Sequence, residues 1–372
     1  MVRVVPVRCD VIRFSLDDPS DVSGLAGALK TGRLHARDIV AVIGKTHGNG
    51  LVNDHTRGFL TLSLALLIGR HTGEAPEEVR ARVPFVFSGG VEGVLSPHYT
   101  VFATSSDAGG QTREPALAIG VAFTSPYQPA DIGRQHQIDT TAEAVRQGMK
   151  QAGIASAEHV HFVQVKGPAF TSEDIYTSER PTASDNAGRL MALGRAASAL
   201  GVAKALGEVP EALATESALL KDLSLFSSVA SCSAGVEVQC NEVIVIGMSS
   251  SWSGPLAITH GVMADALDLQ GIHAVLASAG MSAQPQLDYG QARRLRAAFV
   301  KCEAARSGKI RGRGHTMLND GDIDQQRHIR AAVGAITASV LNETELFVSG
   351  GAEHQGPDGG GILALIAVRE SA

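Results

Sequence analysis

One short motif occurs three times in this chain of 372 residues. The first copy begins at Ser88 and the last at Ser349, and both read Ser-Gly-Gly-x-Glu after an apolar segment rich in valine and phenylalanine. The middle copy begins at Ser233, where alanine replaces the first glycine. Self-similarity of this kind within one chain is typical of repeat architectures. The motif therefore predicts three structurally similar repeats.

Two further residue types recur together with the serine motif. Each predicted repeat has a buried strand that ends on a lysine and a helix that carries an arginine. The lysines are Lys45, Lys166 and Lys301, and the arginines are Arg57, Arg195 and Arg330. Arg195 and Arg330 each follow their lysine by 29 positions, which favours Arg330 over Arg327 as the third arginine. Arg57 follows Lys45 by only 12 positions, so the first repeat aligns less securely.

Hydrophobic periodicity predicts the elements around these residues. Strands are expected at 4–14, 39–45, 84–87, 116–123, 161–168, 242–248, 346–348 and 362–368. Helices are expected at 23–30, 53–71, 140–152, 186–206 and 324–340, with a helical or mixed segment at 287–300. Polar and glycine-rich linkers are expected at 104–115 and 249–255. The repeats would then span 1–104, 112–251 and 256–372.

Composition excludes several classes of protein. The net charge of −6 argues against a nucleic-acid binder, which usually presents a basic surface. No apolar run reaches the ~18 residues of a membrane helix, and the first ten residues lack the apolar core of a secretory signal. The four cysteines include no C-x-x-C pair, so we expect reduced thiols and a cytoplasmic location.

The triplicated lysine, serine and arginine suggest a common chemistry. Burial disfavours the charged form of a lysine, and a neutral lysine can take the proton of a serine hydroxyl. Small residues after each serine let backbone N–H groups approach a substrate and stabilise an oxyanion. Arginine offers a rigid fork of donors to carbonyl oxygens. Any one of these residues alone is more simply a solvated charge or a tight turn, but their threefold recurrence favours a socket for a small ring of alternating carbonyl and N–H groups.

Several longer segments resemble the cyanuric acid hydrolase and barbiturase family of cyclic amide hydrolases, and most of all its cyanuric acid hydrolases. The similarity extends over nearly the whole chain. It rests on segments 42–50, 52–54, 88–98, 162–166, 260–263, 314–318 and 349–357. The resemblance implies an α/β fold of three repeats, each a four-stranded sheet with flanking helices, about a pseudo-three-fold axis. It also implies hydrolysis of the s-triazine ring of cyanuric acid to carboxybiuret, which then loses carbon dioxide to give biuret.

The resemblance also assigns roles to residues of this chain. In the family the middle repeat provides the reacting pair, which implies Lys166 as the base and Ser233 as the nucleophile. The other residues would hold the ring. They are Lys45, Arg57, Ser88, Gly89, Arg195, Ala234, Lys301, Arg330, Ser349 and Gly350. The backbone N–H groups of Gly89, Ala234 and Gly350, each of which directly follows a serine, would contact ring carbonyls.

The family further implies one structural divalent metal and a homotetramer, without a catalytic cofactor. The metal ligands would be Glu303 with oxygens from Ala352, Gln355, Gly356, Pro357 and Gly360. A single carboxylate among carbonyl oxygens suits a hard cation, Mg²⁺ or Ca²⁺.

Several alternatives stay open. Ser231 is the second candidate for the nucleophile, and Cys232 is expected to be a buried thiol. His98 and His354 follow two of the serine turns at different offsets, which favours structural roles. A barbiturase and a binding protein without catalysis are the alternative functions. The chain has no complete phosphate-binding loop, no G-x-S-x-G and no H-E-x-x-H, which argues against nucleotide, α/β-hydrolase and zinc-protease chemistry.

Overall fold

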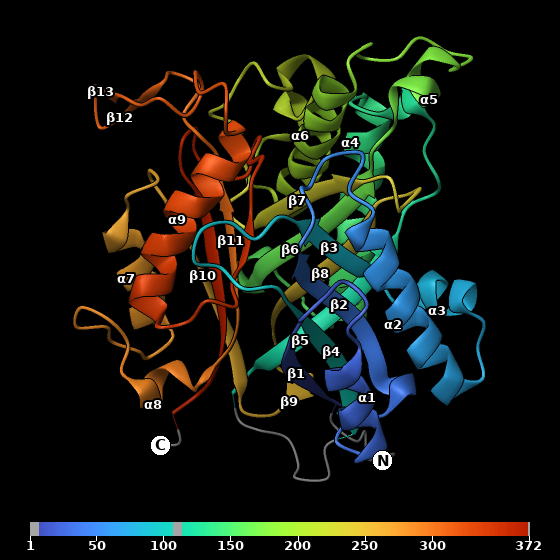
Figure 1. Cartoon of the computed structure of the whole chain (residues 1–372), viewed down its shortest axis with the longest axis vertical. Helices are drawn as coiled ribbons and strands as arrows, with labels where there is room; N and C mark the ends of the chain where they lie inside the picture. The colour runs from blue at the N-terminus through green and yellow to red at the C-terminus, as the bar shows by residue number, and fades with distance from the viewer. Residues whose placement is uncertain (1–6, 107–113, 371–372) are drawn as a thin grey trace.

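Three mixed β-sheets form the protein in a computed structural model that describes residues 7–106 and 114–370 (Figure 1). The first sheet has the order β3 (Phe85–Gly89), β2 (Ile39–Thr46), β4 (His98–Ser106), β1 (Val7–Ser15) and the short β9 (Trp252–Ser253). The second has the order β7 (Ala230–Gly235), β6 (Val160–Pro168), β8 (Glu242–Ser249) and β5 (Ala116–Phe123). The third has the order β14 (Phe347–Ser349), β11 (Leu295–Cys302), β15 (Gly361–Val368) and β10 (Leu256–Met263).

The three sheets share one topology. In each, the strand that ends on lysine is parallel to the serine strand and antiparallel to the last strand of the repeat, which is also antiparallel to the first. A register irregularity recurs at the start of the lysine strand, after Ile39, Val160 and Leu295. The predicted α/β fold of three similar repeats is therefore confirmed, and each repeat contributes four strands to its sheet, while the short β9 adds a fifth strand to the first sheet.

Helices cover the outer faces of the sheets (Figure 1). The first sheet carries α1 (Ser23–Lys30), α2 (Thr56–Thr72) and α3 (Pro76–Arg82). The second carries α4 (Gln135–Gln151) and α6 (Ala187–Leu206), with the short α5 (Ser172–Tyr176) nearby. The third carries α7 (Leu269–Ser278), α8 (Tyr289–Ala292) and α9 (Gln325–Leu341), and a hairpin of β12 (Lys309–Ile310) and β13 (Arg313–Gly314) extends beyond it. None of the helices in the described ranges combines the length and the apolar character needed to cross a membrane.

The inner faces of all three sheets meet in one shared core. Alternation along a strand sends successive side chains to opposite faces. In β15, Ile362, Ala364 and Ile366 enter the shared core, whereas Leu363 and Leu365 pack under the helices of the third repeat. Phe299 lies at its centre, with ring centroids 4.5 Å from Phe162, 6.0 Å from Phe347 and 6.5 Å from Phe102. Because both faces are buried, the strands are almost continuously apolar.

Some sequence expectations were wrong in detail. Most of 287–300 is not helical, because residues 295–302 form β11 between two partner strands, and only Tyr289–Ala292 is a helix. Residues 104–106 continue β4 rather than beginning a linker, and residues 252–253 form β9 within the other predicted linker. Residues 107–113 of the first linker, and residues 4–6 of the first predicted strand, lie outside the described residues. The limits 1–104, 112–251 and 256–372 stay our proposed boundaries for the repeats.

Candidate active site

Strand register places each predicted lysine beside its serine. The paired positions on adjacent parallel strands are Lys45 and Ser88, Lys166 and Ser233, and Lys301 and Ser349. All three lysine side chains are fully buried. Each pair stands at the end of its strands, where the backbone turns at the small residues after the serine. The same register in three sheets therefore produces the same chemical pair three times.

The three sets converge on a single cavity of about 310 Å³. Its lining includes the predicted residues Arg57, Ser88, Gly89, Lys166, Arg195, Ser233, Ala234, Arg330, Ser349 and Gly350. The other two lysines, Lys45 and Lys301, lie against this lining and contact Ser88 and Ser349. A cavity of this size fits a small ligand. The structure thus brings together every residue predicted for the substrate site.

The outer two lysine–serine pairs are hydrogen-bonded. Lys45 Nζ lies 3.1 Å from Ser88 Oγ, and Lys301 Nζ lies 3.0 Å from Ser349 Oγ. Lys301 also donates to the carbonyl oxygens of Cys232 and Gly350, at 2.6 and 2.8 Å. Burial, together with the positive charge of Arg195, lowers the pKa of Lys301 to about 7. Burial and Arg330 hold the pKa of Lys45 well below its ordinary value.

The middle pair is arranged differently. Lys166 Nζ donates to the carbonyl oxygens of Phe87, at 2.8 Å, and Ala234, at 3.3 Å, and forms an ion pair with Glu237. Ser233 Oγ is buried and has no hydrogen-bond partner among the described residues. Burial lowers the pKa of Lys166 to about 8, and the carboxylate of Glu237 opposes that shift. A buried hydroxyl without a partner is unusual in a folded protein, and here it faces the cavity.

Three glutamates, for which the sequence predicted no role, complete the site. Each occupies the last position of the serine motif and forms an ion pair with an arginine of another repeat. The pairs are Glu92 with Arg330, Glu237 with Arg57, and Glu353 with Arg195. They connect the first repeat to the third, the second to the first and the third to the second, which closes a ring. The fixed offset of four residues after each serine was the signal that identifies them.

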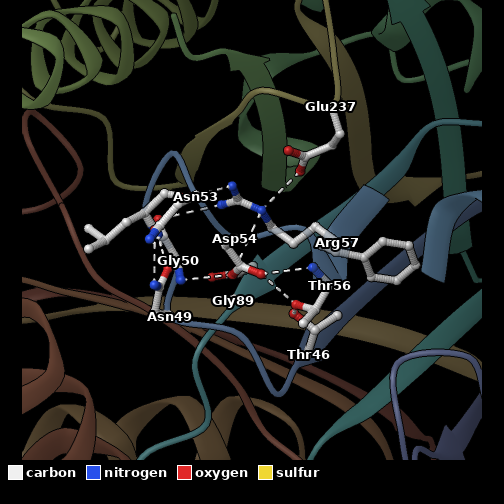
Figure 2. Close-up of polar contacts among 12 residues, drawn as sticks. Thr46, Asn49, Gly50, Asn53, Asp54, Thr56, Arg57, Gly89 and Glu237 are labelled. Carbon is white, nitrogen blue, oxygen red and sulfur yellow. Dashed lines mark hydrogen bonds and ion pairs between the residues drawn. The ribbon is translucent and has the colours of Figure 1, made fainter. Parts of the chain in front are cut away.

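Figure 2 shows the polar contacts that hold a loop of the first repeat, and residues 49–51 of this loop line the cavity. Asp54, which is only 3% exposed, accepts hydrogen bonds from the N–H groups of Gly50, at 2.8 Å, and Thr56, at 3.0 Å. Burial alone would raise the pKa of Asp54. The hydrogen bonds from Thr56 and Gly50 and the positive charge of Arg57 nevertheless hold this pKa below its ordinary value. Arg57 donates to the carbonyl oxygen of Leu51 at 3.0 Å. Asp54 and Arg57 thereby fix the segment that places residues 49–51 in the cavity wall.

The same network explains why glycine follows Ser88 although alanine follows Ser233. A Cβ added to Gly89 would lie 1.7 Å from Asp54 Oδ2 and 2.6 Å from the backbone nitrogen of Gly50. We therefore expect Gly89→Ala to displace the loop and to lower kcat/KM by about 100-fold, since small misplacements of positioning groups cost that much. Steady-state kinetics would measure this loss of kcat/KM.

Gly27→Ala in α1 is the control for this variant, because a Cβ there meets nothing within 4 Å. We expect it to keep the activity of the parent chain. If Gly89→Ala also kept that activity while remaining folded, the close packing of Asp54 against Gly89 would have no functional consequence.

The predicted metal ligands belong to two segments of the third repeat, which one backbone hydrogen bond joins. The N–H of Glu303 donates to the carbonyl oxygen of Gly360, at 3.3 Å, and the loop 352–360 folds back beside it. Glu303 Oε1 accepts from Arg306, whereas Oε2 is buried without a partner. Within the described ranges no three His, Cys, Asp or Glu side chains are grouped to bind a metal. A free carboxylate oxygen near backbone carbonyls nevertheless fits the predicted oxygen-rich ligand set.

The structure also locates the second candidate nucleophile, the neighbouring cysteine and the two histidines. Ser231 is buried and does not belong to the described lining of the cavity. Cys232 is buried, and this raises the pKa of its thiol to about 12. The imidazoles of His98 and His354 bond to backbone groups of Ser96, Leu220 and Leu225, which is a structural arrangement.

Known proteins resemble this chain over almost its entire length. The family model described as "Amidohydrolase ring-opening protein" matches residues 10–368. A cyanuric acid amidohydrolase of Pseudomonas sp. (strain ADP) is 47% identical over 365 residues, covering 96% of this chain and 98% of the relative. One from Azorhizobium caulinodans is 47% identical over 362 residues, with the same coverage. A solved cyanuric acid hydrolase structure has a TM-score of 0.94 and 45% identity, covering 98% of this chain and all of its own.

Proposed function

The chain belongs to the ring-opening amidohydrolase family of the cyanuric acid amidohydrolases, and we propose that it hydrolyses cyanuric acid to carboxybiuret. The observation that carries this proposal is the convergence of three lysine–serine–arginine sets on one cavity. Cyanuric acid has three carbonyl groups that alternate with three N–H groups around one ring. Each repeat therefore meets the same chemical group of the substrate.

We propose that Ser233 is the nucleophile and that Lys166 is its base. Ser88 and Ser349 are each hydrogen-bonded to a lysine, whereas the oxygen of Ser233 is free of partners among the described residues. Register places Lys166 beside Ser233, so a rotation of the lysine side chain is enough to form the pair. The resemblance to the family supports the same assignment. Against it stands the pair of Lys45 and Ser88, which is already formed.

In the proposed reaction, neutral Lys166 takes the proton of Ser233 as Oγ attacks a ring carbonyl carbon. A C–O bond forms, and the carbonyl π electrons move to oxygen, where the backbone N–H that follows the serine stabilises the charge. The ring C–N bond then breaks, and its nitrogen receives the proton held by Lys166. Water then attacks the carbonyl carbon of the resulting carbamate while Lys166 takes its proton. The bond between that carbon and Oγ breaks, and Ser233 Oγ receives the proton from Lys166. The released carboxybiuret loses carbon dioxide to give biuret.

The remaining sets hold the ring in place. Arg57, Arg195 and Arg330 would each direct N–H donors at a ring carbonyl, and the glutamate ring would fix the three guanidinium groups. Ser88 and Ser349, with the N–H groups of Gly89 and Gly350, would contact the two carbonyls that do not react. Fixing three points of a rigid ring leaves the scissile bond in a single orientation at Ser233.

Barbituric acid tests the substrate assignment, because a CH₂ group replaces one N–H of the ring. A site that pairs with all three ring N–H groups leaves one of its own polar groups unpaired when barbituric acid binds. Sites of this kind favour the matching substrate by about 10⁴-fold. We expect kcat/KM for cyanuric acid to exceed that for barbituric acid by a factor of this order when both are assayed side by side. Faster turnover of barbituric acid would identify a barbiturase. Calorimetric binding of cyanuric acid without release of carbon dioxide would identify a binding protein.

We propose that one Mg²⁺ or Ca²⁺ is bound at Glu303 and the carbonyl oxygens of residues 352–360. The unpartnered Glu303 Oε2 supports this. When bound, the cation would supply positive charge that holds this loop, while the residues of the loop keep Glu353 in contact with Arg195. Metal analysis of the purified protein tests the proposal.

We also propose a homotetramer in the cytoplasm. The family resemblance suggests the tetramer, and light scattering of the purified protein tests it. All four cysteines are free thiols, which fits a reducing compartment. Fractionation of the cells that express the protein tests that location.

A further inference from the structure

The ring of glutamate–arginine pairs is not symmetric. Glu92 and Glu353 each hold their arginine with two hydrogen bonds, at 2.6 and 2.8 Å for Glu92 and 2.5 and 2.8 Å for Glu353. Such two-pronged pairs fix both side chains. Glu237 makes a single contact of 3.3 Å with Arg57 Nε. The middle glutamate is therefore only loosely held by its arginine.

Glu237 has a second positive neighbour instead. Its Oε1 lies 2.8 Å from Lys166 Nζ, and both side chains are almost fully buried. No ion pair joins the other two glutamates to a site lysine within the residues that the structure describes. This short contact of Glu237 opposes the effect of burial on the pKa of Lys166.

The charged groups that act on Lys166 come from three places in the fold. Glu237 follows β7, Glu242 begins β8 directly opposite Lys166, and Arg57 lies on α2. Burial raises the pKa of Glu242 to about 8, so below that pH this carboxyl is mostly neutral. Arg80 on α3 acts on Glu242 rather than on the lysine. Glu237 is thus the principal negative charge facing Lys166 near neutral pH.

A buried lysine is useful as a base only if it is basic enough to keep the proton that it takes. General bases work best when their pKa lies near the working pH. Burial and Arg330 hold the pKa of Lys45 well below the ordinary value, although Glu92 opposes the shift without forming an ion pair with that lysine among the described residues. Lys166 is equally buried, yet its pKa falls only to about 8, because Glu237 opposes the effect of burial.

We propose that Glu237 is a positioning residue for the reaction, whose carboxylate keeps Lys166 basic enough to take and hold the proton of Ser233. This inference rests on the proposed function, and it depends on a direct contact with the lysine that the two counterparts of Glu237 do not make within the described residues. Glu92 and Glu353 each hold an arginine with two hydrogen bonds, whereas Glu237 contacts its arginine once and is paired with Lys166.

Glu237→Gln tests the proposal by pH–rate profiles of kcat/KM. In the parent chain we expect activity to rise with pH as Lys166 loses its proton, with a midpoint near 8. Removing the opposite charge lowers the lysine pKa, so the rise should move by about 1 to 3 pH units toward acid. The weaker base should also lower the plateau by at least about 10-fold. A purely structural role would lower the plateau and leave the midpoint in place.

Glu92→Gln is the matched control, because Glu92 occupies the same motif position and pairs with Arg330 only. We expect it to lower activity without moving the midpoint. Glu242→Gln shows whether the titration belongs to that carboxyl instead. The proposal is overturned if the midpoint is unchanged in Glu237→Gln, or if it moves in Glu92→Gln or Glu242→Gln rather than there.

A measurement without substrate separates this inference from the proposed function. Protein labelled with ¹³C-lysine is titrated by NMR, with the Lys166 signal assigned by its loss in Lys166→Ala. The signal should titrate at lower pH in Glu237→Gln than in the parent chain. An unchanged titration overturns the inference, whereas a parent chain that fails to hydrolyse cyanuric acid overturns only the proposed function. If Glu237→Gln does not fold, Glu237→Asp should show a smaller shift in the same direction, and no shift would again overturn the inference.

Discussion

Replacing Ser233 with alanine is expected to lower kcat on cyanuric acid by about 10⁴-fold or more, since removal of a nucleophile that acts with its base abolishes most catalysis. Lys166→Ala should cost a similar factor, because the two groups act as a unit. Combining the two changes should add little. Stopped assays of biuret and carbon dioxide would measure these rates, and circular dichroism would confirm folding.

The chain supplies its own controls for this experiment. Ser88→Ala and Ser349→Ala remove the same hydroxyl from the same motif in the outer repeats, where we expect losses mainly in substrate binding and a much smaller fall in kcat. If Ser233→Ala instead kept near-normal kcat while Ser88→Ala abolished it, the reacting pair would be Lys45 and Ser88. Loss of kcat in Ser349→Ala alone would likewise assign the reaction to Lys301 and Ser349, since both outer pairs are already hydrogen-bonded.

Replacing Phe299 with alanine is expected to cost about 3 to 5 kcal/mol of unfolding free energy, the usual price of deleting a buried aromatic side chain. Phe299 is 1% exposed and contacts phenylalanine rings from all three repeats. The cavity left behind would lie where the sheets meet, so the repeats would lose their common contact. Urea denaturation followed by circular dichroism would measure the loss.

Phe59→Ala is the control for that prediction. Phe59 lies on α2 and is 54% exposed, so its removal should change the unfolding free energy by no more than about 0.5 kcal/mol. If Phe299→Ala proved as mild as Phe59→Ala, the shared core would contribute little to holding the repeats together.

Much of the architecture could be predicted because the three repeats are recognisable as similar segments of the sequence. The serine motif and the 29-residue spacing in two repeats indicated three similar units before any coordinates. The three lysines could be identified because each one ends an apolar run that predicts a buried strand. The same arrangement recurs in every repeat. That these strand ends meet at one cavity was suggested by the threefold recurrence of the three residue types and implied again by the family resemblance.

Other features depend on contacts between repeats, which no local pattern encodes. Residues 295–302 are strand because two partner strands pair with them, although local periodicity equally allowed a helix. The glutamates of the motif find their arginines in a different repeat, hundreds of positions away for Glu92 and Arg330. The direction of Lys166, toward Glu237 and away from Ser233, is a side-chain choice that its position in the strand leaves open.

A crystal structure of the Ser233→Ala variant with cyanuric acid bound tests the central claim most directly. The account predicts one ring inside the cavity, with each of its three carbonyl groups at one arginine and at the backbone N–H of Gly89, Ala234 or Gly350. A ring bound outside this cavity, or one that meets the residues of a single repeat, would contradict it.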